Sequence, residues 1–196
     1  MTSKNKKILA GGFTLVETLA AILLLSIALA GPMVIAQKGL QASLIAKDQD
    51  TAFNLAQDAV EYIRFARDSH CLTANNPAGC PAASWLTGAG GPSLANCIST
   101  DGSATCTLDD FAGSAAAACS GACSPINYDT SRNQYTYTAA GGNVISTSYT
   151  RTISIRYNAS CSGACNKDEA STTVTVSWND PQPHSIQVQE TLYDWQ

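Results

Sequence analysis

A long apolar run dominates the N-terminal part of the chain. Residues 18–36 contain no charged side chain and are rich in Leu, Ile and Ala. As an α-helix, residues 13–36 would extend about 36 Å, enough to cross a hydrocarbon core of about 30 Å. The pattern therefore predicts one membrane-spanning helix. Gly31 and Pro32 lie within it, and because proline lacks the amide proton and clashes with the preceding turn, we expect a helix break there, as a bend or a locally melted turn.

Helical spacing continues beyond this segment, over residues 37–69. Apolar side chains recur every three or four residues, at Ala52, Leu55, Ala56, Ala59, Ile63 and Ala66. This spacing predicts an amphipathic continuation of the helix whose apolar stripe packs on its own domain. Charged side chains fall largely away from the stripe and indicate a solvated face: Asp48, Asp50, Asp58, Glu61, Arg64 and Arg67.

The last third of the chain, residues 133–196, changes to a period of two. Its segments rich in Thr, Val, Ile, Tyr and Trp predict four antiparallel strands at residues 134–138, 149–157, 172–178 and 185–193. Val174, Val176 and Trp178 should share one face, and so should Ile153, Ile155 and Tyr157. Asn, Asp and Pro at residues 179–183 indicate a turn between the last two strands.

Residues 70–132 lack a clear period and are punctuated by Pro, Gly and Cys. So long a loop is unusual in a compact domain, so either cysteines constrain it or short strands lie within it. The expected fold class is therefore α+β. A long N-terminal helix, membrane-spanning in its first half, packs on a C-terminal antiparallel β-sheet, with a disulfide-rich irregular middle.

Charge at the N-terminus refines the membrane prediction. Lys4, Lys6 and Lys7 precede the apolar run and favour a cytoplasmic N-terminus, with the rest of the chain outside. Glu17 lies at the head of the run. Because a carboxylate inside a membrane helix costs about 2.5–3.5 kcal/mol on insertion scales, Glu17 is expected to have a partner and a function.

The stretch Gly11-Gly12-Phe13-Thr14-Leu15-Val16-Glu17 resembles the N-terminal segment of the type IV pilin and pseudopilin family. The resemblance implies that residues 1–12 are a leader, that a prepilin peptidase cuts between Gly12 and Phe13, and that the new terminus at Phe13 is N-methylated. It also implies that Glu17 serves assembly by neutralising the terminal amine of a neighbouring subunit, and that Gly31 and Pro32 mark local extension of the helix.

Two further segments resemble the family. Residues 174–180 and 186–195 are similar to the closing hairpin of many minor pilins, and residues 55–64 resemble minor pilins more than a major fibre subunit. The function implied is that of a minor pilin or pseudopilin in a type IV pilus, type II secretion or DNA-uptake machine. The implied partners are the prepilin peptidase, other pilin subunits, an assembly platform and, before assembly, the cytoplasmic (inner) membrane. After assembly the protein is expected at the cell surface or in the periplasm.

Overall charge argues against broad nucleic-acid binding. Without the three leader lysines, eight of the 11 Lys and Arg remain against 15 Asp and Glu, a net charge of −7. Such an acidic domain repels the phosphate backbone, although local contact with nucleic acid at a filament tip stays open. Charged residues are only 13% of the chain, which predicts a neutral, hydroxyl-rich exterior.

All eight cysteines lie beyond the apolar run, at Cys71, Cys80, Cys97, Cys106, Cys119, Cys123, Cys161 and Cys165. An even number in an exported domain favours disulfides. The first four form two couples nine residues apart, and Cys-Ser-Gly-Ala-Cys occurs twice, so we expect local pairing within each couple. Structural zinc is the alternative for the two Cys-x-x-x-Cys couples, because four thiolates at that spacing can form a tetrahedral site.

The residues of a catalytic or cofactor site do not come together in this sequence. No set of nucleophile, acid and base can be assembled around His70 or His184 from the sequence, so structural roles are favoured for both histidines. Asp109, Asp110, Asp168 and Glu169 are acidic loop residues without calcium-ligand spacing. The sequence therefore indicates a protein that is not an enzyme and that carries no cofactor and, apart from the zinc alternative at the two Cys-x-x-x-Cys couples, no metal.

The competing interpretation is a secreted or membrane-anchored, disulfide-rich adhesin or binding domain. Ala28-Leu29-Ala30 is a small-residue pattern of the kind that signal peptidases cut after an apolar region. Cleavage there would leave Gly31 at the terminus with Pro32 beside the cut. The mass of the mature N-terminus separates the two interpretations.

Overall fold

The structure is a computed structural model of the whole chain. It describes Gly12, residues 14–73 (side chains to Ser69), Leu86 and residues 93–109, 116–157, 169–180 and 182–193. The chain divides into two compact units, Met1–Lys47 and Asp48–Gln196. We call the second unit the head.

Helix α1, Leu15–Thr73, is the only α-helix among the described residues. It runs through Gly31 and Pro32 without a break in its helical assignment, so the local extension expected there is not adopted. A proline removes one backbone donor, and the remaining hydrogen bonds of a helix this long keep the turn helical. A Cβ at Gly31 would meet nothing within 4 Å, so contacts with the described part of the chain do not require a glycine there.

The first unit exposes the apolar run. Within α1, its large apolar side chains from Leu15 to Leu44 are between 51% and 75% exposed. In the part of the chain that the structure describes, α1 is the one helix long and apolar enough to cross a membrane. Helical backbone satisfies its own polar groups, which is the requirement for residing in lipid.

The head is built around a mixed sheet with the strand order β3-β2-β7-β8-β9. Its long strands are β7 (Thr150–Tyr157), β8 (Glu169–Asn179) and β9 (Pro183–Tyr193), which pair antiparallel in sequence order. These confirm three of the four predicted strands. The short strands β2 (Cys106–Thr107) and β3 (Ala117–Ala118) extend the sheet beyond β7.

Another short strand adds a parallel pair. Strand β1 (Ile98–Ser99) follows the 3-10 helix η1 (Ala95–Cys97) and pairs parallel with β7. Short strands, together with the Cys97–Cys106 and Cys119–Cys123 disulfides, therefore organise the described parts of the middle region that looked irregular in the sequence.

The fourth predicted strand belongs to a different sheet. Strand β5 (Gln134–Thr136) pairs with β4 (Asn127–Asp129), which also pairs with β6 (Val144–Ser146), in the order β5-β4-β6. A tight turn holds the β4–β5 hairpin: the Asp129 carboxylate accepts from the Ser131 amide at 2.9 Å, and Asn133 adopts a positive φ of 57°. Because this hairpin closes locally, β5 pairs with its sequence neighbour and not with β7.

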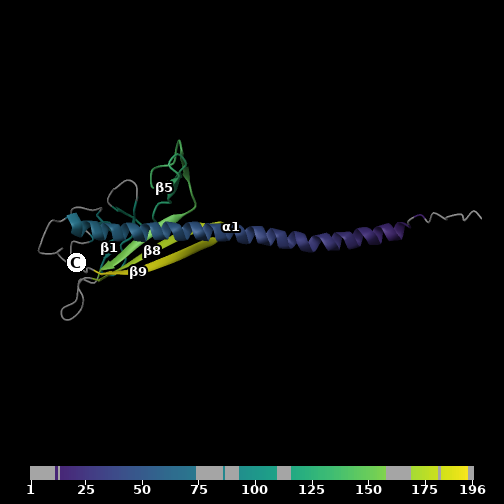
Figure 1. The fold of residues 1–196 in the computed structure, drawn as a ribbon, viewed down its shortest axis with the longest axis horizontal. Coiled ribbons are helices and arrows are strands. Elements are labelled where there is room, and N and C mark those ends of the chain that lie inside the picture. Colours follow the sequence, from purple (N-terminus) through teal and green to yellow (C-terminus); the bar gives the residue numbers. More distant parts are fainter. Residues whose placement is uncertain are drawn as a thin grey trace, which may run out of the picture. The chain divides into compact units, whose positions relative to one another are not determined.

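The second half of α1 packs along the β7-β8-β9 sheet (Figure 1). All six predicted stripe positions, Ala52 to Ala66, are buried, each at most 3% exposed. Opposite them, Ile153, Ile155, Val174, Val176 and Trp178 are buried on the inward phase of the strands. The structure thus confirms the α+β fold, with a long helix packed on an antiparallel meander.

Arg151 is a buried charge in this core. Its side chain is 1% exposed. Nη1 donates to the Leu55 carbonyl at 3.1 Å and Nη2 to the Leu108 carbonyl at 2.6 Å, while Cζ lies 6.0 Å from the centroid of the Tyr137 ring. The guanidinium therefore links α1, the segment after β2 and β7.

The outward phase of the same three strands is polar. The pairing registers of β7 with β8 and of β8 with β9 align the outward side chains of the three strands in rows. Every residue in these rows is exposed or half-buried. We call this surface the hydroxyl array. Its four rows are Thr150–Ser177–Ser185, Thr152–Thr175–Gln187, Ser154–Thr173–Gln189 and Arg156–Ser171–Thr191.

Candidate functional site

The start of α1 is organised by Thr14. The Glu17 amide donates to the Thr14 hydroxyl at 3.3 Å and to the Thr14 carbonyl at 3.1 Å. A threonine followed by a glutamate three residues later is the pattern of a capping box. The sequence contained this signal for the helix start, but our interpretation of Glu17 as a membrane carboxylate overlooked it.

Glu17 lies in the first turn of α1 and is exposed. A carboxylate there interacts favourably with the helix dipole, by about 0.3–1 kcal/mol. The hydroxyls that follow are satisfied within the helix, since Thr18 Oγ1 donates to the Leu15 carbonyl and Ser26 Oγ to the Ile22 carbonyl, each at 2.8 Å. Among these three polar side chains, only Glu17 carries a charge into the apolar segment.

Gly12 is described and exposed, and a Cβ placed on it would meet nothing within 4 Å. Among the described residues, therefore, nothing gives a steric reason for a glycine at this position. Phe13, the predicted new terminus, lies outside the described residues, as do residues 1–11 of the predicted leader.

Two disulfides join the cysteines whose side chains the structure describes. Cys97 pairs with Cys106 across nine residues and Cys119 with Cys123 across four, each with Cα atoms 4.9 Å apart. These are two of the local couples expected from the sequence. The side chain of Cys71, and Cys80, Cys161 and Cys165, lie outside the described residues.

The disulfides bear on the zinc alternative. With its sulfurs bonded to each other, the Cys119–Cys123 couple has no thiolate to offer a metal. Within the described ranges, His, Cys, Asp and Glu form no group of three or more able to hold a metal ion.

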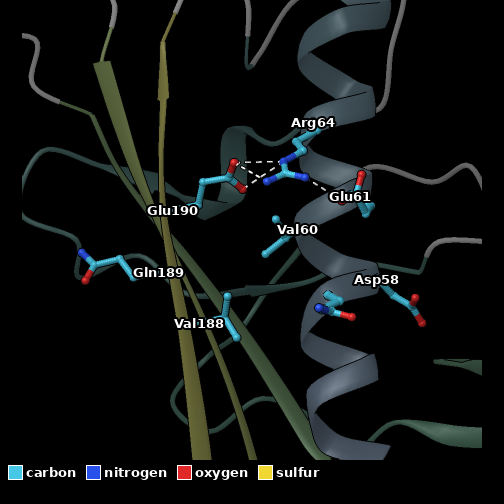
Figure 2. A pocket seen from close by; sticks show the side chains of 8 residues that line it. Asp58, Val60, Glu61, Arg64, Val188, Gln189 and Glu190 are labelled. Carbon is cyan, nitrogen blue, oxygen red and sulfur yellow. Dashed lines mark hydrogen bonds and ion pairs between the residues drawn. The ribbon is translucent and has the colours of Figure 1, made fainter.

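A groove of about 430 Å³ lies between α1 and the edge strand β9 (Figure 2). Val60 and Val188 lie between the helix and the strand, and an ion pair of two further lining residues, Arg64 and Glu190, joins the helix to the strand. Arg64 donates to Glu190 through Nε at 2.9 Å and through Nη2 at 2.6 Å, and it also donates through Nη1 to Glu61 at 2.6 Å.

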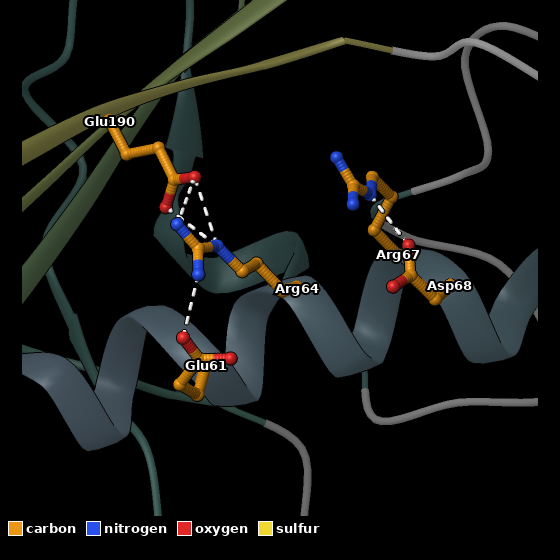
Figure 3. A network of polar contacts seen from close by, with 5 residues as sticks. All are labelled: Glu61, Arg64, Arg67, Asp68 and Glu190. Atoms are coloured by element: carbon orange, nitrogen blue, oxygen red, sulfur yellow. Dashed lines mark hydrogen bonds and ion pairs between the residues drawn. The ribbon is translucent and has the colours of Figure 1, made fainter.

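The ion pairs on this face of the helix form two groups (Figure 3). Glu190 and Glu61 share Arg64, whereas Arg67 pairs with Asp68 at 2.8 Å. The hydrogen bond to Glu190 is the largest cause that raises the pKa of Arg64 above its ordinary value. This arrangement holds β9 against the helix, and it contains no nucleophile with an adjacent base.

A second contact fixes the beginning of the head. Tyr149 donates its hydroxyl to Asp48 at 3.0 Å. Partial burial and this hydrogen bond raise the pKa of Tyr149 to about 12, so the phenol is neutral at physiological pH and acts as a donor. Asp48 was expected on a solvated face, but it is half-buried and bonded.

The remaining candidate residues have structural contacts. Asp109 accepts from Thr136 Oγ1 at 3.0 Å and from the Tyr137 amide at 3.1 Å, so its carboxylate orders the β5 segment. His184 stacks on Trp178 with ring centroids 5.4 Å apart. Glu169 is exposed at the start of β8.

Other candidates lie beyond what the structure describes: Asp110, Asp168 and the side chain of His70.

Comparisons with protein-family models, with curated proteins and with solved structures found no match to this chain.

Proposed function

We propose that this protein is a membrane-inserted, pilin-like subunit, a minor pilin or pseudopilin that acts by assembly and not by catalysis. The observation that carries the proposal is the exposed apolar half of α1 with an acidic residue, Glu17, in its first turn. An apolar surface of this length needs lipid or the helices of other subunits to cover it.

The position of Glu17 supports packing between subunits. A carboxylate in an apolar setting needs a partner of opposite charge. The amine of a processed Phe13 would lie four residues earlier, so two parallel helices staggered by roughly one turn, about 5.4 Å, bring the amine of one subunit to the carboxylate of the next. Methylation of that amine keeps its charge.

The free energies involved distinguish an assembly role of Glu17 from a role in helix capping alone. The dipole interaction of a first-turn carboxylate is worth about 0.3–1 kcal/mol. Removing one partner of a buried charge pair costs about 3–5 kcal/mol, because the other charge stays uncompensated. A large assembly defect in a charge-neutral variant would therefore exceed what the loss of the helix-dipole interaction explains.

Gly12 supports processing by an external enzyme. Since no described neighbour within the chain requires a glycine there, its small size suits the approach of a peptidase to the backbone at the Gly12–Phe13 bond. The basic residues Lys4, Lys6 and Lys7 are those that would keep the leader on the cytoplasmic side.

The architecture of the head is compatible with this proposal. The second half of α1 supplies one side of the core and two disulfides staple the segments between helix and meander, as suits a domain outside the cytoplasm. The proposed partners are the prepilin peptidase, other pilin subunits, the assembly platform and the cytoplasmic membrane, with the head outside.

The test is the intact mass of the protein purified from membranes and, separately, from sheared filaments. A terminus at Phe13 with one added methyl group supports the proposal. A terminus at Gly31 would replace it with the secreted binding domain. A full-length chain in cells with an active prepilin peptidase would also contradict it.

A further inference from the structure

The hydroxyl array on the outward phase of β7, β8 and β9 is unusual in its chemistry. Of its twelve positions only Arg156 is charged, and none is apolar. The solvated face of a sheet commonly carries Lys and Glu, and both are missing from these rows. Neighbouring strands lie about 4.8 Å apart and outward side chains along one strand about 6.8 Å apart, so the hydroxyl and amide groups form a regular grid.

A loop makes part of this face concave. Residues 101–105 border the grid along β7 and leave a hollow of about 380 Å³ over its middle rows. Ser154 Oγ donates to the Gly102 carbonyl at 2.7 Å, which ties the loop to the strand. Gly102 has a φ of +80°, a conformation that favours glycine. A glycine at this position therefore allows the loop to run close to β7.

Charge at the hollow is balanced. Asp101 accepts hydrogen bonds from the Ser103 amide at 3.0 Å and from the Ser103 hydroxyl at 2.7 Å. These bonds lower the pKa of Asp101 to about 2, so it is a carboxylate at neutral pH. Arg156 lines the same hollow and carries the opposite charge, so the surface selects neither a polyanion nor a polycation.

We infer that the hydroxyl array is a binding surface for a neutral glycan. Hydroxyls both donate and accept, and each glutamine amide adds two donors and an acceptor, so the grid matches a ligand with many hydroxyl groups and no net charge. Thr173, Thr175, Gln187 and Gln189 are among the residues that line the hollow.

The composition favours a glycan over a protein partner. Protein interfaces depend on a few buried aromatic, apolar or arginine anchors, and the rows of the array provide one Arg and no apolar group. An aromatic ring does lie at one end of the same face: Tyr193, opposite Glu169 in the next row, is 46% exposed. Its ring offers an apolar surface to the C–H face of a sugar.

The test uses the full chain in a zwitterionic detergent, because a detergent with a sugar headgroup would compete for the site. Native affinity electrophoresis is run in gels containing dextran, hydroxyethyl cellulose or alginate, with a reference protein of similar size to correct for sieving. Neutral polysaccharide should retard the protein, and alginate, which is anionic, should not.

Variants locate the site. Thr173→Val with Thr175→Val removes two hydroxyls that line the hollow and should raise the dissociation constant about tenfold. Ser146→Val removes an exposed hydroxyl on β6, which belongs to the other sheet, and should leave binding unchanged. Near-ultraviolet circular dichroism checks that each variant is folded. Gln187→Met with Gln189→Met, on the edge strand, repeats the test if the first pair perturbs the sheet.

Three results would overturn the inference: no retardation by either neutral polysaccharide, equal retardation of the array variants and the wild type, or preference for alginate. None of these results depends on membrane insertion or on filament assembly, so the glycan site and the proposed function succeed or fail separately.

Discussion

The two described disulfides should contribute unequally to the stability of the head. The change is the replacement of both cysteines of one bridge by alanine, as Cys97→Ala with Cys106→Ala in one variant and Cys119→Ala with Cys123→Ala in another. Both variants keep the remaining cysteines, so each isolates one bridge.

Loop length sets the first part of the difference. The bridges span nine and four residues. With the chain-entropy relation, closing these loops stabilises the folded head by about 2.6 and about 1.9 kcal/mol at 25 °C. The two values differ by only about 0.7 kcal/mol, because the entropy depends on the logarithm of loop length.

The burial of the cysteines accounts for the larger part of the stability difference between the two variants. Cys97 and Cys106 are both 0% exposed within the core, whereas Cys123 is 8% exposed and Cys119 is half-buried outside it. Removing a fully buried sulfur leaves a small cavity that costs on the order of 1 kcal/mol. The Cys97–Cys106 variant should therefore lose about 4–5 kcal/mol and the Cys119–Cys123 variant about 2–3 kcal/mol.

The assay is thermal unfolding of the full chain in micelles, followed by near-ultraviolet circular dichroism. For a domain of about 150 residues, 1 kcal/mol corresponds to about 2–4 °C, so we expect losses of about 10–15 °C and about 5–8 °C. Reductant should lower the melting temperature of the wild type, and a chelator should leave it unchanged.

An equal or larger loss in the Cys119–Cys123 variant would refute the reasoning from loop length and burial. If a chelator lowered the melting temperature and reductant did not, the cysteines would stabilise the head by binding zinc and not by forming disulfides.

Three further changes test the anchor and the groove. Gly12→Leu should leave uncut precursor in the membrane because a bulky side chain obstructs the peptidase, and an unchanged processing shift on gels would contradict the proposed function. Glu17→Gln should be made, cleaved and retained in the membrane but depleted from sheared filaments, with about 3–5 kcal/mol lost at the amine of the neighbour; equal incorporation of variant and wild type would remove its assembly role. Arg64→Glu should destabilise the head by about 1 kcal/mol, and adding Glu190→Arg should recover about 0.5–1 kcal/mol in urea unfolding, a modest value because Arg64 is 42% exposed. No recovery would mean that the ion pair does not hold β9 to the helix.

Long, periodic segments of this fold were predictable from sequence. The stripe from Ala52 to Ala66 is buried as its spacing indicated, and three period-two segments became β7, β8 and β9. These patterns are informative because each repeats over several turns or pleats, so one exception does not obscure the period.

Short elements were not predictable in the same way. Strands β1, β2 and β3 have two residues each, too few to show a period, and they exist because neighbouring strands and a disulfide hold them. The parallel pairing of β1 with β7 joins residues more than fifty positions apart, as Ile98 with Ile155, and local propensity carries no information on such a contact.

Some site residues left a signal that was not used. Arg151 occupies the same alternation phase as Ile153 and Ile155, so the sequence already placed a charge on the inward face of its strand. The outward Thr and Ser positions of β7 and β8 likewise showed a polar face free of Lys. The register between strands could not be predicted from the sequence, and it is this register that aligns the outward side chains of neighbouring strands in rows.

The buried guanidinium of Arg151 has a consequence for the order in which the head can fold. The carbonyl acceptors at Leu55 and Leu108 are 96 and 43 positions away along the chain. Until both segments are in place, strand β7 cannot close on the helix without desolvating a cation that lacks those acceptors, at a cost of several kcal/mol. Partly assembled heads are therefore penalised, and the helix, the segment after β2 and strand β7 should form together in one cooperative step. A head that becomes available from its N-terminal end would therefore remain open at least until β7 had been added.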